Sequence, residues 1–254
     1  MDLQIYIKIR QYLSCLFLAL CLMVNINLRA QEAYDITFED ASNQFGGLMN
    51  PSGLGLFYRH LSPAQKQKSQ LWELAFSGIH DFREKKIMNQ KLYGTTPYVY
   101  GKVNRLYALR PLYGINQTLS EKTNKNSVGI NVFAAMGPCL GFLKPNYVVI
   151  EVPDPTNMRY VSESVKYNPE VHKYEDVVGY APFRYGLNET KPLIGLSFKA
   201  GVNFNWGYYS QEFKSIELGC MIDYLPSQPE ILHGVANKSV FSAFYVSFAF
   251  GNSY

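Results

Sequence analysis

The segment PLIGLSFKAGVNFNWG, residues 192–207, alternates apolar and polar side chains along its whole length. The apolar set is Ile194, Leu196, Phe198, Ala200, Val202, Phe204 and Trp206. Strict period-two alternation predicts a β-strand whose two faces meet different media. A soluble sandwich and a membrane barrel can both contain such a strand, so the direction of the apolar face has to be argued from the rest of the chain.

Other segments repeat this alternation, and the connections between them alternate in length. The segments are SGLGLFYRH, SQLWELAFSG, SVGINVF, SIELGCMIDY and SVFSAFYVSFAFGNSY. Short polar connections such as SPAQKQK and SEKTNKN alternate with longer ones such as residues 152–191. Outer-membrane barrels show this asymmetry, with short periplasmic turns and longer external loops. The pattern therefore predicts an all-β chain that forms a transmembrane antiparallel up-and-down β-barrel, with a long external loop at about 152–191.

The number of strands follows from counting these segments. Strands are expected near 48–61, 69–83, 97–117, 127–143, 193–207, 214–225 and 240–252. Because single-chain bacterial barrels have even strand numbers, we expect about 8 strands, with 10 as the alternative. Residues 34–46 are the first choice for the eighth strand, and a hairpin within 144–191 is the alternative. The segment 97–117 does not keep a single phase, which predicts a bulge near Pro111.

The N-terminal segment predicts export. Lys8 and Arg10 precede the apolar run YLSCLFLALCLMV, and Ala30 is a small residue ahead of the expected cut. A membrane-spanning helix needs about 20 apolar residues, whereas polar residues interrupt this run early. We therefore expect residues 1–30 to be a cleaved signal peptide and residues 31–254 to form the barrel in the outer membrane of a Gram-negative cell.

Composition narrows the class of partner. The whole chain has 24 Lys and Arg and 20 Asp and Glu, and removing residues 1–30 leaves 21 and 19. This near-neutral balance predicts no nucleic-acid partner. Aromatic residues make up 15% of the chain and charged residues 17%, which suits strands bordered by aromatic girdles. Cys139 and Cys220 would remain after cleavage, and we interpret them as unrelated thiols, with a disulfide as the alternative.

The polar face of the alternating strands carries full charges. The charges expected to point into the lumen are Arg59, Glu73, Lys102, Lys199, Glu217 and Asp223. The assignment of Lys102 depends on the expected bulge. The interior of an eight-stranded barrel is just wide enough for side chains to fill. We therefore expect these charges to pair in a filled structural core, with a narrow channel or a small-ligand binding site as the alternative.

Four long stretches carry a family resemblance. They are YVYGKVNRLYALRPLYG, NKNSVGINVFAAMGPCLGFLKPNY, KAGVNFNWG and YVSFAFGNSY. Together they resemble an uncharacterised family of small outer-membrane β-barrel proteins from Bacteroidota, over roughly residues 50–254. The resemblance implies a signal peptide and an outer-membrane barrel, and it implies no known activity or catalytic residues. The aromatic C-terminal segment is similar to the signal that the barrel-assembly machinery reads.

Patterns that would indicate an enzyme or a metal site are sparse. His60, His80, His172 and His233 lie in separate segments, so we predict no metal site and no cofactor. His60 and Ser62 have the spacing that lipid A deacylases use, but the pair falls at the periplasmic end of its strand, away from lipid A in the outer leaflet. Because the topology opposes that chemistry, we do not expect an enzyme. A lipid-modifying outer-membrane enzyme is the less favoured alternative.

The expected function is that of a structural or accessory component of the cell envelope. Opposite charges inside the barrel can neutralise one another, which favours a plug over a pathway for ions. The partners expected are outer-membrane lipid, the barrel-assembly machinery and another envelope protein complex, such as the type IX secretion apparatus. A narrow channel or small-ligand binder remains the non-enzymatic alternative.

Overall fold

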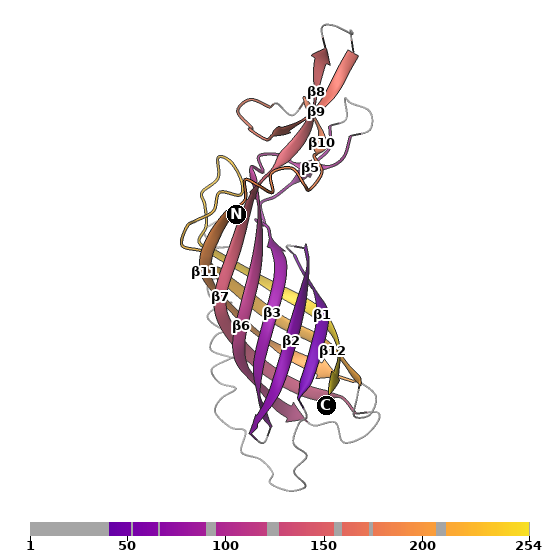
Figure 1. Ribbon diagram of the computed structural model, residues 1–254, viewed down its shortest axis with the longest axis vertical. Helices are drawn as coiled ribbons and strands as arrows, with labels where there is room; N and C mark the ends of the chain where they lie inside the picture. Colours follow the sequence, from indigo (N-terminus) through magenta and orange to yellow (C-terminus); the bar gives the residue numbers. More distant parts are fainter. Residues whose placement is uncertain are drawn as a thin grey trace, which may run out of the picture. The chain divides into compact units, whose positions relative to one another are not determined.

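Figure 1 shows the computed structural model of the chain. The structure describes residues 41–254, except 52, 66, 90–94, 121–126, 155–158, 173–174, 207–211 and 254. The expected signal peptide, residues 1–30, lies outside the described residues. No helix among the described residues is long and apolar enough to cross a membrane.

Eight antiparallel strands close into a barrel (Figure 1). They are β1 (Ser42–Asn50), β2 (Gly53–Gln65), β3 (Lys68–Ile79), β6 (Asn104–Ser120), β7 (Gly129–Pro145), β11 (Lys191–Asn205), β12 (Glu212–Tyr224) and β13 (Val240–Ser253). Each barrel strand pairs with the next barrel strand along the chain, and β1 pairs with β13 to close the wall. This up-and-down order confirms the predicted fold and the expected number of strands.

The boundaries of the first two strands differ from the prediction. The eighth strand is β1, which overlaps only the last part of the expected segment 34–46. The expected strand 48–61 contains the end of β1, a turn and the start of β2. Gly53 has a φ of 122°, which residues with a Cβ rarely adopt. Because the connection is so short, it hardly interrupts the apolar pattern, and the sequence predicted one strand where the structure has two.

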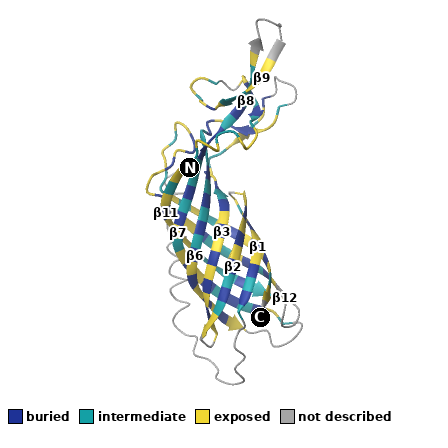
Figure 2. Cartoon of the chain, in the orientation of Figure 1, coloured by how far each residue is buried: buried dark blue, intermediate teal, exposed yellow. Residues whose placement is uncertain are grey.

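Side chains alternate between the two faces of the wall, as Figure 2 shows by their burial. On β11, Ile194, Leu196 and Phe198 are exposed, whereas Ser197 and Lys199 are buried. The other barrel strands alternate in the same way, with mostly apolar side chains exposed outside. The interior combines polar and charged side chains with large apolar ones such as Phe57, Leu71 and Phe133. A soluble sandwich would bury its apolar face, so the exposed apolar wall is that of a transmembrane barrel.

The two ends of the barrel carry different connections. The end at which β1 begins and β13 finishes, here called the turn end, has the connections 66–67, 121–128 and 206–211. The opposite end, here called the loop end, has the connections 51–52, 80–103, 146–190 and 225–239. Short and long connections therefore alternate as predicted, except that the first loop-end connection is a tight turn.

The loop-end connections contain strands of their own. β8 (Tyr147–Asp154), β9 (Arg159–Lys166) and β10 (Val177–Tyr180) form a three-stranded sheet in the order β10-β8-β9. β4 (Lys86–Ile87) pairs with β5 (Tyr98–Val99). Residues 152–191, predicted as a loop, therefore include regular strands. The hairpin considered within 144–191 exists as β8 and β9, but it lies outside the barrel wall.

Asn146 joins the barrel wall to this loop-end sheet, because it is the single residue between β7 and β8. Its backbone N–H donates to the Val103 carbonyl at 2.8 Å, and its own carbonyl accepts from the Tyr167 N–H at 2.9 Å. Its side-chain Nδ2 donates to the Lys102 carbonyl at 2.9 Å, and its Oδ1 accepts from Arg105 Nε at 3.1 Å. Four hydrogen bonds thus fix the direction in which the chain leaves the wall.

The bulge predicted near Pro111 occurs elsewhere on β6. The pairs on either side of Pro111 keep one register with β7, and this register sets Pro111 opposite Pro138. Because proline has no N–H, the pairing between β6 and β7 is interrupted at these two residues, but the register does not shift there. The register shifts instead between Thr118 and Ser120, near the turn end.

Candidate functional site

Four charged side chains from four strands meet inside the barrel. Arg59 of β2, Glu73 of β3, Lys199 of β11 and Glu217 of β12 are all buried. Each belongs to the inward-facing set of its strand, as the alternation predicts. We call these residues the central quartet.

Every charge of the central quartet contacts two opposite charges. The Arg59 guanidinium lies 2.6 Å from a Glu73 oxygen and 2.7 Å from a Glu217 oxygen. Lys199 Nζ lies 2.6 Å from the second Glu73 oxygen and 3.2 Å from the second Glu217 oxygen. The two cations and two anions cancel, so the quartet carries no net charge. Excellent geometry and reciprocal pairing are what a buried ionic group requires to offset its loss of water.

Aromatic rings enclose the two cations of the central quartet. The Arg59 guanidinium carbon lies 4.6 Å from the centre of the Phe133 ring. Lys199 Nζ lies 4.8 Å from the centre of the Phe57 ring. At these distances the ring faces attract the cations, and the rings also occupy space that water would otherwise fill.

Tyr245 of β13 completes the surroundings of Glu217. Its hydroxyl donates a hydrogen bond to Glu217 Oε1 at 2.7 Å. The ring has room because Gly219 lies beside it, and a Cβ at Gly219 would lie 2.6 Å from Tyr245 Cζ. A glycine at this position therefore allows the tyrosine to reach the carboxylate.

A second ion pair lies in the lumen and was only half predicted. Arg110 of β6 donates through Nε and Nη2 to the two oxygens of Asp223, each at 2.7 Å. Ser197 donates to Asp223 at 2.7 Å, and Ser77 accepts from Arg110 at 2.8 Å. Alternation along β12 predicted that Asp223 points into the lumen, whereas Arg110 was not predicted there. The nearest inward neighbours, Ala108 and Leu112, are apolar, so no polar alternation marks Arg110 in this part of β6.

Lys102 does not join these clusters, contrary to the expected lumen position. It lies between β5 and β6, outside the barrel strands, and its Nζ is 2.6 Å from Glu84 Oε2. Burial lowers the pKa of Lys102, and the Glu84 carboxylate opposes that shift. The reason for the difference is that β6 begins at Asn104, so the predicted strand 97–117 includes loop-end residues.

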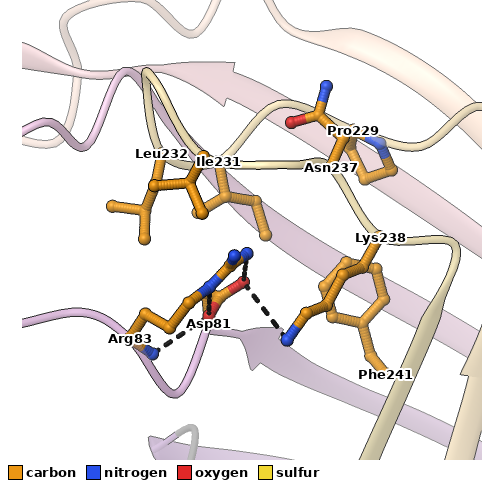
Figure 3. A pocket seen from close by; sticks show the side chains of 9 residues that line it. Asp81, Arg83, Pro229, Ile231, Leu232, Asn237, Lys238 and Phe241 are labelled. Atoms are coloured by element: carbon orange, nitrogen blue, oxygen red, sulfur yellow. Dashed lines mark hydrogen bonds and ion pairs between the residues drawn. The ribbon is translucent and has the colours of Figure 1, made fainter.

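A small pocket at the loop end has polar and apolar walls (Figure 3). Its volume is about 10 Å³, room for about one water molecule. Arg83 Nη2 lies 2.7 Å from Asp81 Oδ2, and Lys238 Nζ lies 4.0 Å from the same oxygen. The Arg83 guanidinium holds the pKa of the Asp81 carboxyl below its usual value. The acidic group is therefore already satisfied, and the space suits water better than an organic ligand.

The outer surface of the wall carries a hydrogen-bonded trio near the turn end. His60 Nε2 lies 2.8 Å from Ser62 Oγ, and His60 Nδ1 lies 2.7 Å from Asn43 Oδ1. The Tyr58 hydroxyl donates to the same Asn43 oxygen at 3.0 Å. We call Asn43, His60 and Ser62 the outer-wall trio. The spacing of His60 and Ser62 was noted from the sequence, whereas Asn43, which lies on β1, was not predicted to join them.

The two cysteines lie on opposite faces of the wall. Cys139 of β7 is buried on the inward face, whereas Cys220 of β12 pairs with the outward-facing Phe244 of β13. They are not bridged to each other.

Comparison with known proteins finds only distant similarity to solved structures. No protein-family model and no curated protein sequence matches it. The structure of Ail, the attachment invasion locus protein of Yersinia pestis, is similar at 11% identity and a TM-score of 0.39, over 84% of this chain and 99% of that chain. The N-terminal β-barrel domain of Pseudomonas aeruginosa OprF is similar at 8% identity and a TM-score of 0.34, over 85% and 98%.

Neisserial surface protein A is similar at 10% identity and a TM-score of 0.33, over 85% of this chain and 95% of that chain. These identities and TM-scores are low, so the barrel assignment rests on the strand pairing and burial within this chain. The resemblance to a Bacteroidota family stays a prediction.

Proposed function

We propose that the protein is an outer-membrane β-barrel that acts as a structural or accessory component of the cell envelope, with its lumen filled and closed to ions. In this proposal residues 1–30 are removed on export, the barrel-assembly machinery inserts the chain, and outer-membrane lipid surrounds the wall. The turn end faces the periplasm and the loop end faces the outside. The exposed apolar wall supports this placement, because it needs hydrocarbon around it.

The observation that carries the proposal is the central quartet. A conducting pore needs polar groups that water and ions can reach, whereas Lys199 and Glu217 have side-chain exposures of 0% and 1%. Their charges are balanced within the quartet, and the rings of Phe57 and Phe133 lie beside Lys199. An ion entering the lumen would have to break these contacts.

Planar-bilayer recording tests the closed lumen. The full chain without residues 1–30, folded in detergent and reconstituted, should give no steady single-channel conductance. Co-sedimentation with lipid vesicles and the mobility shift between unheated and boiled samples verify that the barrel is folded and inserted. Steady conductance from verified barrels would contradict the proposal and support the narrow channel instead.

Copurification tests the accessory role. Mild detergent extraction, affinity capture of the tagged protein and mass spectrometry should recover an envelope protein in a fixed ratio to the barrel. A tagged, unrelated barrel of the same membrane is the control for abundant contaminants. Recovery of the barrel alone under several detergents would argue against a stable partner complex.

Thiol labelling tests the orientation. Val171 lies in a loop-end segment and is exposed, and Lys68 lies at the turn end and is exposed. A membrane-impermeant maleimide should label Val171→Cys in intact cells and Lys68→Cys only after the outer membrane is broken. The opposite pattern would reverse the orientation.

A further inference from the structure

We propose that the outer-wall trio is a serine esterase site, and that its substrate is the acyl ester of a glycerophospholipid in the membrane leaflet at the turn end. Ser62 is the nucleophile, His60 is the general base and acid, and Asn43 is a positioning residue. The barrel then combines a closed interior with a reactive exterior.

The hydrogen bonds of the trio run in the order that nucleophilic catalysis requires. A hydroxyl nucleophile needs a base within about 2.6–3.2 Å, and that base needs a third group that orients it. The distances are 2.8 Å from Ser62 Oγ to His60 Nε2 and 2.7 Å from His60 Nδ1 to Asn43 Oδ1.

The acceptor on Asn43 fixes the tautomer of His60. Oδ1 accepts, so the ring proton lies on Nδ1, which leaves Nε2 free to take the Ser62 proton. Tyr58 donates to the same oxygen at 3.0 Å, which holds the amide with its oxygen toward the imidazole. The trio therefore has the hydrogen-bond arrangement that a general base needs, with Nε2 directed at the Ser62 hydroxyl.

Strand register explains how three residues from two strands converge. Asn43 of β1 is the direct partner of His60 of β2, and Ser62 follows two residues later on the same face. Residues at i and i+2 on a strand point to the same side. Since Tyr58 and Phe45, also directly paired, are exposed, this side is the outer one.

The surroundings of the trio match a lipid interface. Trp72 of β3 pairs directly with His60, and Tyr113 of β6 pairs directly with Trp72. Both rings are exposed and their centres lie 4.6 Å apart. Aromatic side chains of this kind border the apolar band of a barrel where headgroups and acyl chains meet, which is the depth of a phospholipid ester.

One further side chain can serve the oxyanion. Gln70 of β3 is the direct partner of Ser62 and is exposed on the same face. Directly opposed residues have Cβ atoms about 4.5–5.5 Å apart, so the Gln70 amide can donate to an oxygen that develops beside Ser62 Oγ.

The reaction is an ordinary ester hydrolysis. Ser62 Oγ attacks the ester carbonyl carbon and gives its proton to His60 Nε2. The C–O bond to the glycerol oxygen then breaks, and that oxygen takes the proton from His60. Water then attacks the carbonyl carbon of the acyl-Ser62 ester and gives a proton to His60, so that its oxygen stays on that carbon as a hydroxyl. The bond between the carbonyl carbon and Ser62 Oγ breaks, and Ser62 takes the proton back from His60. One ester and one water give one fatty acid and one lysophospholipid.

The test uses the full chain without residues 1–30, folded in detergent and mixed with phosphatidylethanolamine. Wild-type protein should react covalently with a fluorophosphonate probe at Ser62, located by peptide mass spectrometry, and should release fatty acid. Ser62→Ala should abolish the labelling and lower fatty-acid release at least about a thousandfold. The matched control is Ser242→Ala, an outward-facing exposed serine near the loop-end start of β13, which should leave both signals unchanged.

Variants of Asn43 distinguish a role in positioning His60 for the reaction from a role in folding alone. Asn43→Leu should lower probe labelling and fatty-acid release at least about tenfold, because His60 loses the acceptor that sets its tautomer. Asn43→Asp keeps an acceptor and should restore most of both signals. The gel mobility shift on boiling confirms that every variant is folded.

Two results would overturn the proposal. The first is a folded wild-type barrel that neither labels at Ser62 nor releases fatty acid from phosphatidylethanolamine. The second is release that Ser62→Ala does not reduce, which would assign the activity to a contaminant. Hydrolysis of a short-chain water-soluble ester without hydrolysis of phosphatidylethanolamine would overturn the lipid substrate.

Discussion

Arg59 and His60 are consecutive residues of β2, and each belongs to a different polar cluster on opposite sides of the same wall. Inside, the central quartet holds full charges that are paired and ringed by aromatic side chains. Outside, the outer-wall trio holds an amide, an imidazole and a hydroxyl that bond to one another. The comparison shows that this wall holds its buried charges where opposite charges surround them, whereas hydrogen bonds hold the outer cluster together.

The largest effect should come from breaking the central quartet on one side. Glu217→Ala leaves Arg59 and Lys199 buried beside a single carboxylate, and we expect the free energy of unfolding in lipid vesicles to fall by about 3–5 kcal/mol. His60→Leu, on the other side of the wall, should change it by less than about 1 kcal/mol. Urea titration followed by tryptophan fluorescence measures both. Equal losses would mean that the two clusters contribute alike to stability.

A charge on the lipid side should have the next largest effect. Leu218, in the middle of β12, is exposed on the outer wall, and Leu218→Arg should lower the free energy of unfolding by about 2–4 kcal/mol in vesicles. Val152 of the loop-end sheet is also exposed, and Val152→Arg should be nearly neutral, since it lies outside the barrel. A neutral Leu218→Arg would mean that the wall at this position does not face hydrocarbon.

Loss of the Asn146 side chain should separate the loop-end sheet from the barrel. Asn146→Ala leaves the Lys102 carbonyl without its side-chain donor and removes an acceptor from Arg105, a cost of about 1–3 kcal/mol if the groups stay dry. Limited proteolysis should cut the loop-end segments faster, while the barrel keeps its mobility shift on boiling. Unchanged cleavage would show that backbone bonds alone hold the sheet.

The smallest effect concerns pH. The pKa of Asp81 is lowered, chiefly by the hydrogen bond from Arg83, so its stabilisation is present above the unfolded pKa and is lost as pH falls through the lower folded value. We expect less than about 1 kcal/mol from this partly exposed pair, lost below about pH 4. Thermal melts of wild type and Asp81→Asn between pH 3 and pH 7 should converge at low pH. A difference that grows on acidification would contradict this sign.

The barrel was predictable because its wall repeats one rule along nearly every strand. Trp72, Leu74 and Phe76 on β3 mark the outer face as clearly as Ile194 and Leu196 on β11. Turns of two residues were harder to locate, since they leave the apolar pattern almost intact. The loop-end sheet was anticipated only as an alternative hairpin within 144–191 of the barrel wall. Its place outside the wall was not predicted, because its core, which includes Tyr98 and Val148, gathers residues from separate connections.

The charged clusters in the lumen were predictable only in part, because the partner of each charge depends on the register between strands. The inward direction of Arg59, Glu73, Lys199 and Glu217 follows from alternation, but which carboxylate meets which cation does not. Arg110 went unrecognised among apolar inward neighbours.

No pattern in the sequence predicted that Asn43 contacts His60. Its role depends on pairing with His60 across a strand boundary that the pattern placed elsewhere.

The closing pair of β1 and β13 joins the first and last strands of the barrel, so the wall is incomplete until the whole chain has been made. Arg59 and Glu217 lie on β2 and β12, strands that come together only through this closure. In an open sheet Arg59 would keep Glu73 on the adjacent β3, and Lys199 would keep Glu217 on the adjacent β12, but the contacts across the lumen, Arg59–Glu217 and Lys199–Glu73, would be missing. Closing the cylinder therefore supplies the second counter-ion of all four charges, so the quartet stabilises the closed wall over an open sheet.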